Sequence, residues 1–206
     1  MRWDRGQRVT KSIEFLRHAE SSANAGMPTS NYGAIPLTDA GRSAAEAAAR
    51  DYNGPAPDLI IVSPFRRAQE TAAPFCKRFS AAAVEEWPVQ EFTYLSPGRV
   101  GTTTSAERRP LVEAYWRVAR PGTCDGPGAE SFEHFISRVQ AALAKLRARR
   151  EESILVVCHE MVIKAAMWIE TLDPGVGSDD APRRFREFSL ASTIPNLGRW
   201  SLPIPR

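Results

Sequence analysis

The sequence predicts an α/β fold, a three-layer α/β/α sandwich with a mostly parallel central sheet. Short apolar runs of strand length alternate along the chain with longer segments of helical periodicity, as expected for parallel strands joined by helices. A length of 206 residues and a hydrophobic content of 43% suit one ordinary domain with a substantial core. The sequence has no internal repeat and no linker, so we interpret residues 1–206 as a single domain.

The first predicted unit is a strand followed by a capped helix. Residues 12–16 (SIEFL) are expected to form a short buried strand, and a polar loop of small residues follows from 19 to 31. Thr38 is a good N-cap, because its hydroxyl accepts a backbone N–H of the first helical turn. An alanine-rich helix then runs from Gly41 to about Tyr52, where an Asn-Gly-Pro sequence stops it.

The second predicted unit repeats this order. Residues 58–63 (DLIIVS) contain a continuous apolar run of the kind buried in a parallel sheet. Pro64 is expected at the first position of a helix that continues to about Phe79, since proline is favoured there. Residues 84–87 are a candidate third strand.

The pattern becomes irregular between residues 88 and 128. One helical stretch is expected at 107–117, and a segment rich in Gly, Pro and Thr at 96–105 indicates a long loop. Loops of that length in a compact domain are often functional. We therefore interpret residues 92–128 as a cap insertion of loop and helix.

The last third of the chain returns to regular elements. Apolar side chains keep helical spacing over residues 130–150, which predicts one long amphipathic helix. Residues 153–158 (SILVVC) are expected to form a buried strand, and 161–172 a largely apolar helix. Two weaker strands, 186–190 and 199–203, are expected to close the chain.

The composition argues against several classes of protein. A net charge of +3 is too small to indicate nucleic-acid binding. The three cysteines have no CxxC spacing, which disfavours a disulfide scaffold or zinc knuckle and favours a reducing compartment. The apolar runs are far shorter than the roughly 20 residues that span a bilayer, and the first residues lack a secretory signal. We expect a cytoplasmic protein that binds neither nucleic acid nor membrane.

Basic and histidine side chains follow the predicted strands at the points where the strands end. Arg17 and His18 follow the first strand, Arg66 follows the second, and His159 follows the strand at 153–158. Because ligands bind at the carboxyl ends of the strands in open α/β sheets, we expect these side chains to converge. Guanidinium groups match phosphate oxygens, and imidazole supplies a nucleophile or an acid near neutral pH. The pattern indicates a reactive anion site.

Four segments in order resemble the elements of a known family. Residues 16–21 read LRHAES, with Asn24 just after, and are similar to LRHGExxxN. Residues 36–42 (PLTDAGR) resemble PLTxxGxxQA, residues 63–72 (SPFRRAQETA) resemble SPLxRAxQTA, and residues 156–159 (VVCH) fall where the family has its second histidine. These are the elements of the histidine phosphatase superfamily (phosphoglycerate mutase-like), branch 1, and the resemblance covers most of the chain.

The resemblance implies a role for each side chain at the strand ends. His18 is the expected nucleophile, which takes the phosphoryl group as a phosphohistidine. Three groups are expected to hold the phosphoryl oxygens and stabilise their charge: Arg17, Arg66 and His159. Asn24 is expected to add a neutral donor to the phosphate pocket. Of the two neighbouring arginines, we take Arg66 to face the site and Arg67 to be solvated.

The resemblance also implies a general acid on a carboxylate after the third strand. Glu91 fits that position, with Glu85 and Glu86 as alternatives. This carboxyl group would protonate the leaving alkoxide and then activate water to hydrolyse the phosphohistidine. No metal and no cofactor are expected, because fixed cations take their place.

Two residues depart from the family pattern. Ala19 replaces the glycine after the first histidine, and its methyl group is tolerable if the backbone there does not need a positive φ. Glu160 replaces the glycine after the second histidine. Its carboxylate would either repel substrate and tune His159 toward the protonated form, or point away at a helix start, where an acid is favoured.

The leading functional hypothesis is a metal-independent phosphatase acting on a phosphate monoester through a phosphohistidine on His18. One alternative is a phosphoglycerate mutase-like phosphoryl transferase, although the chain lacks the longer insertions and tails of such mutases. The other is a weakly active phospho-ligand-binding or adaptor protein, which Ala19 and Glu160 keep open. The expected partner is a small phosphorylated substrate, with a phosphoprotein left open, and the chain is expected to be a monomer or homodimer. Aromatic and arginine side chains of residues 92–124 either cover a phosphorylated ligand or only fill and solvate the insertion.

Overall fold

The computed structural model describes residues 11–171 and 177–204 and has one five-stranded sheet with the order β3-β2-β4-β1-β5. The strands are β1 (Ser12–Arg17), β2 (Leu59–Val62), β3 (Ala83–Glu86), β4 (Ser153–Cys158) and β5 (Arg199–Ser201). β1, β2, β3 and β4 pair in parallel, and β5 runs antiparallel to β1 at the edge. The predicted fold class is confirmed.

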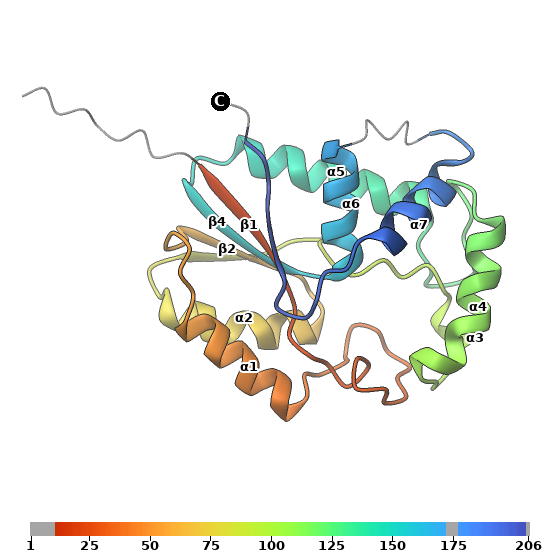
Figure 1. The fold of residues 1–206 in the computed structure, drawn as a ribbon, viewed down its shortest axis with the longest axis horizontal. Helices are drawn as coiled ribbons and strands as arrows, with labels where there is room; N and C mark the ends of the chain where they lie inside the picture. The colour runs from red at the N-terminus through yellow and green to blue at the C-terminus, as the bar shows by residue number, and fades with distance from the viewer. Residues whose placement is uncertain (1–10, 172–176, 205–206) are drawn as a thin grey trace, which may run out of the picture.

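Helices cover both faces of this sheet (Figure 1). One layer contains α1 (Asp39–Arg50) and α2 (Arg66–Arg78), and the opposite layer contains α5 (Phe132–Ala148) and α6 (Glu160–Thr171). Buried side chains of both layers pack on β2 and β4, whose residues are almost all inaccessible to solvent. No helix in the described ranges is long and apolar enough to cross a membrane.

The register of the sheet brings three strand ends to the same level. Arg17 of β1 pairs with Cys158 of β4, and the His18 N–H continues the ladder by donating to the Cys158 carbonyl at 3.0 Å. On the other side of β4, the Ser63 N–H donates to the Val157 carbonyl at 3.1 Å. The residues that follow β1, β2 and β4 therefore meet at one edge, as the parallel order predicts.

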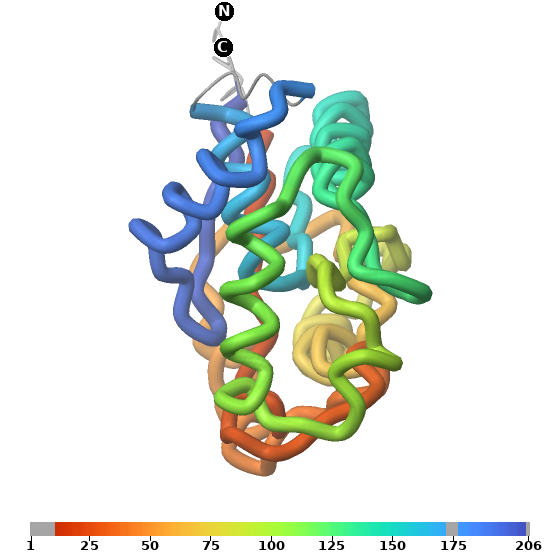
Figure 2. The backbone as a smooth tube through the Cα atoms, turned by 90° about the vertical axis from the view of Figure 1, so that its right-hand side faces the viewer, coloured from red at the N-terminus to blue at the C-terminus, as the bar shows by residue number. Residues whose placement is uncertain are grey.

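The segment 92–128 lies at the end of the molecule where these strand ends meet. It contains α3 (Pro97–Val100) and α4 (Ser105–Val118), which begins with a capping box between Thr104 and Glu107. Figure 2 shows α4, in green, crossing this end of the molecule toward the red loop that follows β1. A backbone bridge between Thr29 and Thr103 ties the two segments together.

The predicted strand at residues 186–190 is wrong, because these residues belong to helix α7 (Ala181–Ala191). The buried residues of α7 are Ala181, Pro182, Phe185 and Ser189, which have helical rather than alternating spacing. Pro182 lies in the first turn, where its missing N–H costs nothing. The strand expected at 199–203 is present as the shorter β5.

Helix α2 also begins later than the sequence predicts. Its first residue is Arg66 rather than Pro64, and Phe65 is the N-cap. The Ser63 hydroxyl accepts the Phe65 N–H at 3.2 Å, which keeps the chain extended for two more residues. This turn determines which neighbouring arginine faces the sheet. For the apolar helix predicted at 161–172, the last residue, Leu172, lies outside the described residues.

Candidate active site

His18 lies directly after β1 and is 3% exposed. Its Nδ1 is 2.7 Å from the Ala19 carbonyl oxygen, which can only accept, so Nδ1 carries the ring proton. The Nε2 atom therefore holds a lone pair, and it accepts a hydrogen bond from Nε–H of Arg67 at 3.1 Å. Burial and the neighbouring Arg67 lower the pKa of His18 to about 3. The imidazole is therefore neutral at physiological pH, with the lone pair of Nε2 available.

His159 lies directly after β4 and is completely buried. The centroids of its ring and the His18 ring are 5.1 Å apart. The Ser63 hydroxyl and His159 Nε2 are hydrogen-bonded at 2.7 Å, and the same hydroxyl accepts the Phe65 N–H. Nδ1 of His159 is buried without a hydrogen-bond partner among the described residues. Burial, then Arg67, keeps the pKa of His159 well below its ordinary value. When the Ser63 hydroxyl donates to Nε2, the ring proton is on Nδ1, which is then an unused neutral donor.

These two buried histidines make stability sensitive to acid. The ordinary pKa of histidine is 6.5, and the pKa of His18 in the folded protein is about 3. Between these two pH values His18 is protonated in the unfolded chain and neutral in the folded protein. The free energy of unfolding therefore falls as pH falls, by up to about 1.4 kcal/mol per pH unit for each such histidine. Urea unfolding at pH 7.5 and 5.0 is expected to show a smaller decrease in the free energy of unfolding for His18→Gln than for the wild type. The exposed His134 provides the control, and an unchanged slope in His18→Gln would contradict this explanation.

The structure corrects the choice between the two neighbouring arginines. Arg66, expected in the site, has a 56% exposed side chain that pairs with Glu70 at 2.6 Å. Arg67, expected in solvent, is 6% exposed and contacts His18. Its Nη1–H also donates to the Tyr32 carbonyl at 2.7 Å. Burial lowers the pKa of Arg67 to about 10, so the guanidinium remains charged at neutral pH. The reason is the late start of α2, which turns its second residue toward the sheet.

Arg17 is the other cation close to the histidines. Its Nη1 donates to the Ile194 carbonyl and forms an ion pair with Glu160 at 3.0 Å. Its Nε is buried without a hydrogen-bond partner among the described residues, so one face of the guanidinium is held and another donor is unused. The second oxygen of Glu160 pairs with Nζ of Lys164 at 2.6 Å. Glu160 is the first residue of α6, but its carboxylate does not point away from the predicted site residues, since it contacts Arg17. Two cations neutralise its charge.

Ala19, the other departure from the family pattern, is accommodated by the backbone. It is fully buried, and its N–H donates to the Thr71 hydroxyl at 3.0 Å. Leu197 is the one non-glycine residue with a positive φ in the described part of the chain, so Ala19 needs no glycine conformation. Gly41, by contrast, has to be glycine, because a Cβ there would collide with the Glu20 backbone oxygen. That close approach holds the loop after β1 against α1.

Glu91 lies in the connection between β3 and α3, beside the start of α6. Its Oε1 accepts the backbone N–H of Phe92 at 3.0 Å and that of Met161 at 3.2 Å. Burial raises the pKa of Glu91, while Arg67 and these backbone donors act in the opposite direction. A carboxyl group with a raised pKa beside a cation that contacts His18 is placed to exchange a proton with a bound group.

The remaining predicted residues lie farther from the histidines. Glu85 pairs with Arg149 at 2.7 Å, and Glu86 accepts a hydrogen bond from Gln69, so neither alternative to Glu91 is near Arg67. Asn24 is exposed, and its Oδ1 accepts from Ser21 and, at 3.3 Å, from Asn196. Asn196 also donates to the His18 carbonyl at 2.9 Å. The predicted contact of Asn24 with phosphate therefore stays a prediction.

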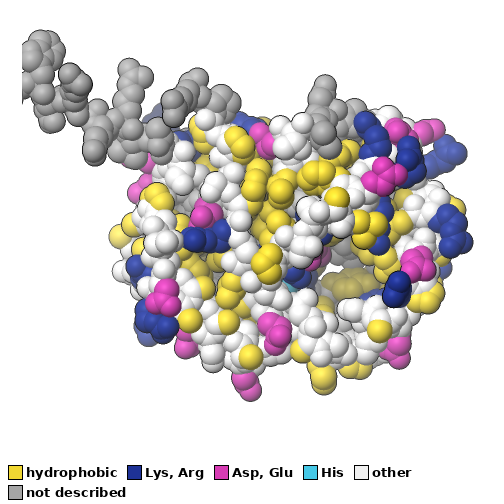
Figure 3. All heavy atoms as spheres, viewed as in Figure 1, with side chains coloured by type: hydrophobic (Ala, Val, Ile, Leu, Met, Phe, Trp, Pro, Cys, Tyr) yellow, Lys and Arg dark blue, Asp and Glu magenta, His cyan; other side chains and the backbone are white. Residues whose placement is uncertain are grey.

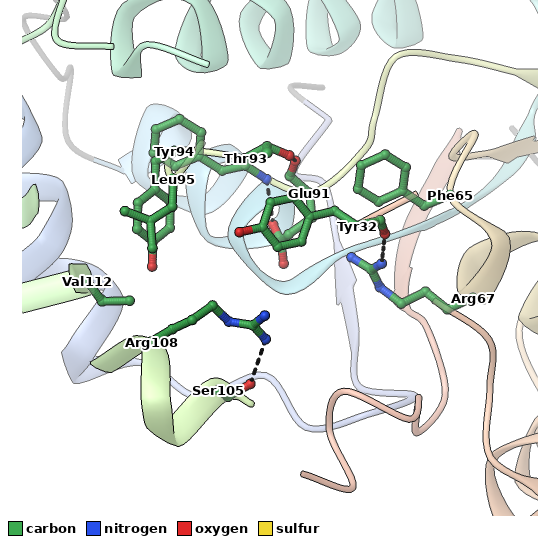
Figure 4. A pocket seen from close by; sticks show the side chains of 11 residues that line it. Tyr32, Phe65, Arg67, Glu91, Thr93, Tyr94, Leu95, Ser105, Arg108 and Val112 are labelled. Atoms are coloured by element: carbon green, nitrogen blue, oxygen red, sulfur yellow. Dashed lines mark hydrogen bonds between the residues drawn. The ribbon is translucent and has the colours of Figure 1, made fainter. Parts of the chain in front are cut away.

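A cavity of about 240 Å³ opens beside these groups, with Arg67 and Glu91 in its lining. Figure 3 shows a hollow between the α3–α4 segment and the rest of the molecule, in which hydrophobic side chains are visible. In Figure 4 the guanidinium groups of Arg67 and Arg108 point into the cavity from opposite sides. No group of three or more His, Cys, Asp and Glu side chains suited to a metal ion occurs within the described ranges.

Fold and site together define an α/β protein with two histidines and two buried or half-buried arginines at one sheet edge. The sequence profile of the histidine phosphatase superfamily (branch 1) matches residues 13–175. The chain therefore belongs to this superfamily and is a phosphatase enzyme.

Several known proteins are similar to this chain in sequence or in structure. The uncharacterized protein Rv0525 of Mycobacterium tuberculosis is 29% identical over 157 residues, which cover 73% of this chain and 74% of that protein. The structure of the mycobacterial glucosyl-3-phosphoglycerate phosphatase Rv2419c is similar with a TM-score of 0.69 and 22% identity, covering 93% of this chain and 89% of that one. The structure of a phosphoserine phosphatase mutant of Entamoeba histolytica in complex with phosphoserine is similar with a TM-score of 0.66 and 19% identity, covering 92% of this chain and 89% of that one. The structural likenesses show a shared fold.

Proposed function

We propose that this protein is a metal-independent phosphatase that hydrolyses a phosphate monoester through a phosphohistidine on Nε2 of His18. The observation that carries the proposal is the hydrogen bond from Nδ1 of His18 to the Ala19 carbonyl oxygen, at 2.7 Å. It fixes the proton on the far side of the ring and leaves the lone pair of Nε2 directed toward Arg67. A neutral, oriented imidazole needs no separate base before it attacks phosphorus.

In the first step, the Nε2 lone pair forms the N–P bond while the bond from phosphorus to the ester oxygen breaks. In the free protein the Nε–H of Arg67 donates a hydrogen bond to Nε2 of His18, and in this step it donates to a phosphoryl oxygen instead. The free Nε–H of Arg17 and Nδ1–H of His159 supply two further donors to the phosphoryl oxygens. Glu91, whose pKa burial raises, gives its proton to the leaving oxygen.

In the second step, Glu91 is a carboxylate and accepts a proton from water. The water oxygen forms a bond to phosphorus as the N–P bond breaks, which returns Nε2 its lone pair and releases inorganic phosphate. We favour hydrolysis over the mutase alternative, in which the phosphoryl group would pass from Nε2 of His18 to a second metabolite instead of to water. Phosphate transfer between two metabolites without phosphate release would favour the mutase.

Metal removal is expected to leave turnover unchanged, because the cationic and neutral donors named above surround the phosphoryl group without a metal ion. Hydrolysis of p-nitrophenyl phosphate is measured before and after dialysis against EDTA. The rate is expected to stay the same within about twofold, the usual scatter of such a comparison. A catalytic metal lowers the barrier by several kcal/mol, so its removal would lower the rate far more than twofold. Loss of turnover that is restored by a divalent cation would reject the metal-independent scheme.

Replacing Glu160 with glycine is expected to lower kcat/KM by about tenfold, the effect of losing roughly one charge-assisted hydrogen bond. The carboxylate holds Nη1 of Arg17 at 3.0 Å and so positions the Nε–H that binds phosphate. Glu160→Gln keeps an acceptor for Nη1 of Arg17, so its kcat/KM is expected to fall less than that of Glu160→Gly. The measurement is steady-state hydrolysis of p-nitrophenyl phosphate, with the effect mainly on KM. A higher rate in Glu160→Gly would instead mean that the carboxylate repels substrate.

A further inference from the structure

We propose that Arg108 is a second anion-binding residue, which selects small aryl phosphate monoesters carrying a carboxylate or similar anion at the far end of the ring. The proposal rests on the proposed function, since it names the substrate class of that same site. The cavity of about 240 Å³ is smaller than the roughly 300–1,000 Å³ of typical ligand pockets. Its size fits a compact leaving group.

Arg108 is a buried cation that forms no ion pair with any carboxylate of the described residues, although the exposed Glu107 lies close enough to interact with it electrostatically. It is 8% exposed on α4, and its Nη1 donates to the Thr29 carbonyl at 3.1 Å and to the Thr103 carbonyl at 3.0 Å. Among the described residues its hydrogen-bond partners are all neutral oxygens, and no ion pair includes it. A buried charge is costly unless it is paired, so this guanidinium is suited to an anionic ligand.

The side chain is held in place before any ligand binds. Arg108 connects the loop after β1, through Thr29, with the start of α4, and its guanidinium carbon is 6.0 Å from the centre of the Tyr32 ring. In Figure 4 its guanidinium points into the cavity, opposite that of Arg67. A preformed donor loses little conformational entropy on binding, which favours specificity at this end of the cavity.

The walls between the two arginines are mainly aromatic or aliphatic. They include Tyr32, Phe65, Phe92, Tyr94 and Val112. A polyhydroxyl leaving group would lose its hydration against these walls and find few partners there, because the neutral polar side chains of the lining are the hydroxyls of Tyr32, Thr93, Tyr94 and Ser105. Each hydroxyl left without a partner costs free energy. A flat ring makes offset or edge contacts with such side chains. Two cations separated by apolar walls therefore fit an aryl body with an anion at each end.

The test uses phosphonates that the enzyme cannot hydrolyse, so binding is separated from turnover. Calorimetry compares benzylphosphonate, 4-carboxybenzylphosphonate and the polyhydroxyl analogue 3,4-dihydroxybutylphosphonate. We expect the carboxylated ligand to bind at least about tenfold more tightly than benzylphosphonate, as a charge-assisted hydrogen bond implies. The dihydroxybutyl compound is expected to bind more weakly than benzylphosphonate.

Two variants separate Arg108 from general effects of charge. In Arg108→Gln the preference for the carboxylated ligand over benzylphosphonate is expected to fall to about twofold or less, because the charge-assisted contact is gone. The affinity for benzylphosphonate is expected to be retained. Arg109→Ala is the matched control, because Arg109 is exposed and pairs with Glu113 at 3.0 Å. Its preference is expected to equal that of the wild type.

Equal affinities of the two benzyl ligands for the wild type would overturn the proposal, even if Arg108→Gln fails to fold. A preference that survives in Arg108→Gln would overturn it as well, and so would binding of neither ligand. Loss of the phosphatase reaction with the preference intact would reject the proposed function and retain the anion-binding role of Arg108.

Discussion

Replacing His18 with alanine is expected to lower turnover of p-nitrophenyl phosphate by about 10³- to 10⁶-fold, the range seen when a covalent nucleophile is removed. The Nε2 atom of His18 is the nucleophile in the proposed mechanism, and its ring is fixed through Nδ1 by the Ala19 carbonyl at 2.7 Å. His159 is not expected to replace it, since Nε2 of His159 is engaged in a hydrogen bond with the Ser63 hydroxyl. Steady-state hydrolysis at pH 7 measures the effect.

The control for this substitution is His134→Ala, because His134 has a 72% exposed side chain on α5 and no role in the proposed reaction. Its turnover is expected to equal that of the wild type. Calorimetric binding of inorganic phosphate by His18→Ala separates lost chemistry from a lost site. Residual turnover in His18→Ala above about one tenth of the wild-type rate, equivalent to only about 1.4 kcal/mol of barrier, would contradict the assignment of the nucleophile.

Replacing Arg67 with alanine is the second large effect, and it is expected to lower kcat by about 10²- to 10³-fold, as the loss of one transition-state donor does elsewhere. Its Nε–H is 3.1 Å from Nε2 of His18, so in the proposed mechanism it lies beside the phosphorus. Arg67→Lys is expected to recover only part of this loss, because an ammonium group lacks the planar fork of guanidinium. The measurement is kcat and KM for p-nitrophenyl phosphate.

Arg66→Ala is the matched control for Arg67→Ala, since the two residues are neighbours of the same type. Arg66 pairs with Glu70 on the exposed side of α2, an interaction worth little to stability and remote from the histidines. Its kinetic constants are expected to stay within about twofold of the wild type, as for a surface substitution. The opposite ranking, with Arg66→Ala the more damaging, would restore the original prediction from the sequence.

The framework of the site could be predicted from the sequence because strand order and strand ends depend on local pattern. Apolar runs located β1, β2 and β4, and the parallel arrangement implied that His18 and His159 meet. The choice between Arg66 and Arg67 failed for two reasons. The element SPLxRAxQTA has one variable residue before its arginine, and that spacing points to Arg67. The start of α2 also depends on a side-chain turn at Ser63 that propensity does not reveal.

Other features depend on tertiary contacts that no local pattern records. The contact of Glu160 with Arg17 joins residues from two different strand ends, and the pairing of Arg108 with Thr29 spans 79 positions of the chain. The cavity walls come from four separate segments, so their apolar character was not visible as a motif. Residues 186–190 were predicted as a weak strand but belong to helix α7.

The central claim is the covalent intermediate, and trapping it is the most direct test. The enzyme is mixed with an excess of p-nitrophenyl phosphate, quenched in alkali within milliseconds, digested and analysed by mass spectrometry. The mechanism predicts a phosphoryl group on the peptide that contains His18, labile to acid and absent from His18→Ala. A wild-type enzyme that releases p-nitrophenol with no phosphate on His18, or with the phosphate on another residue, would contradict it.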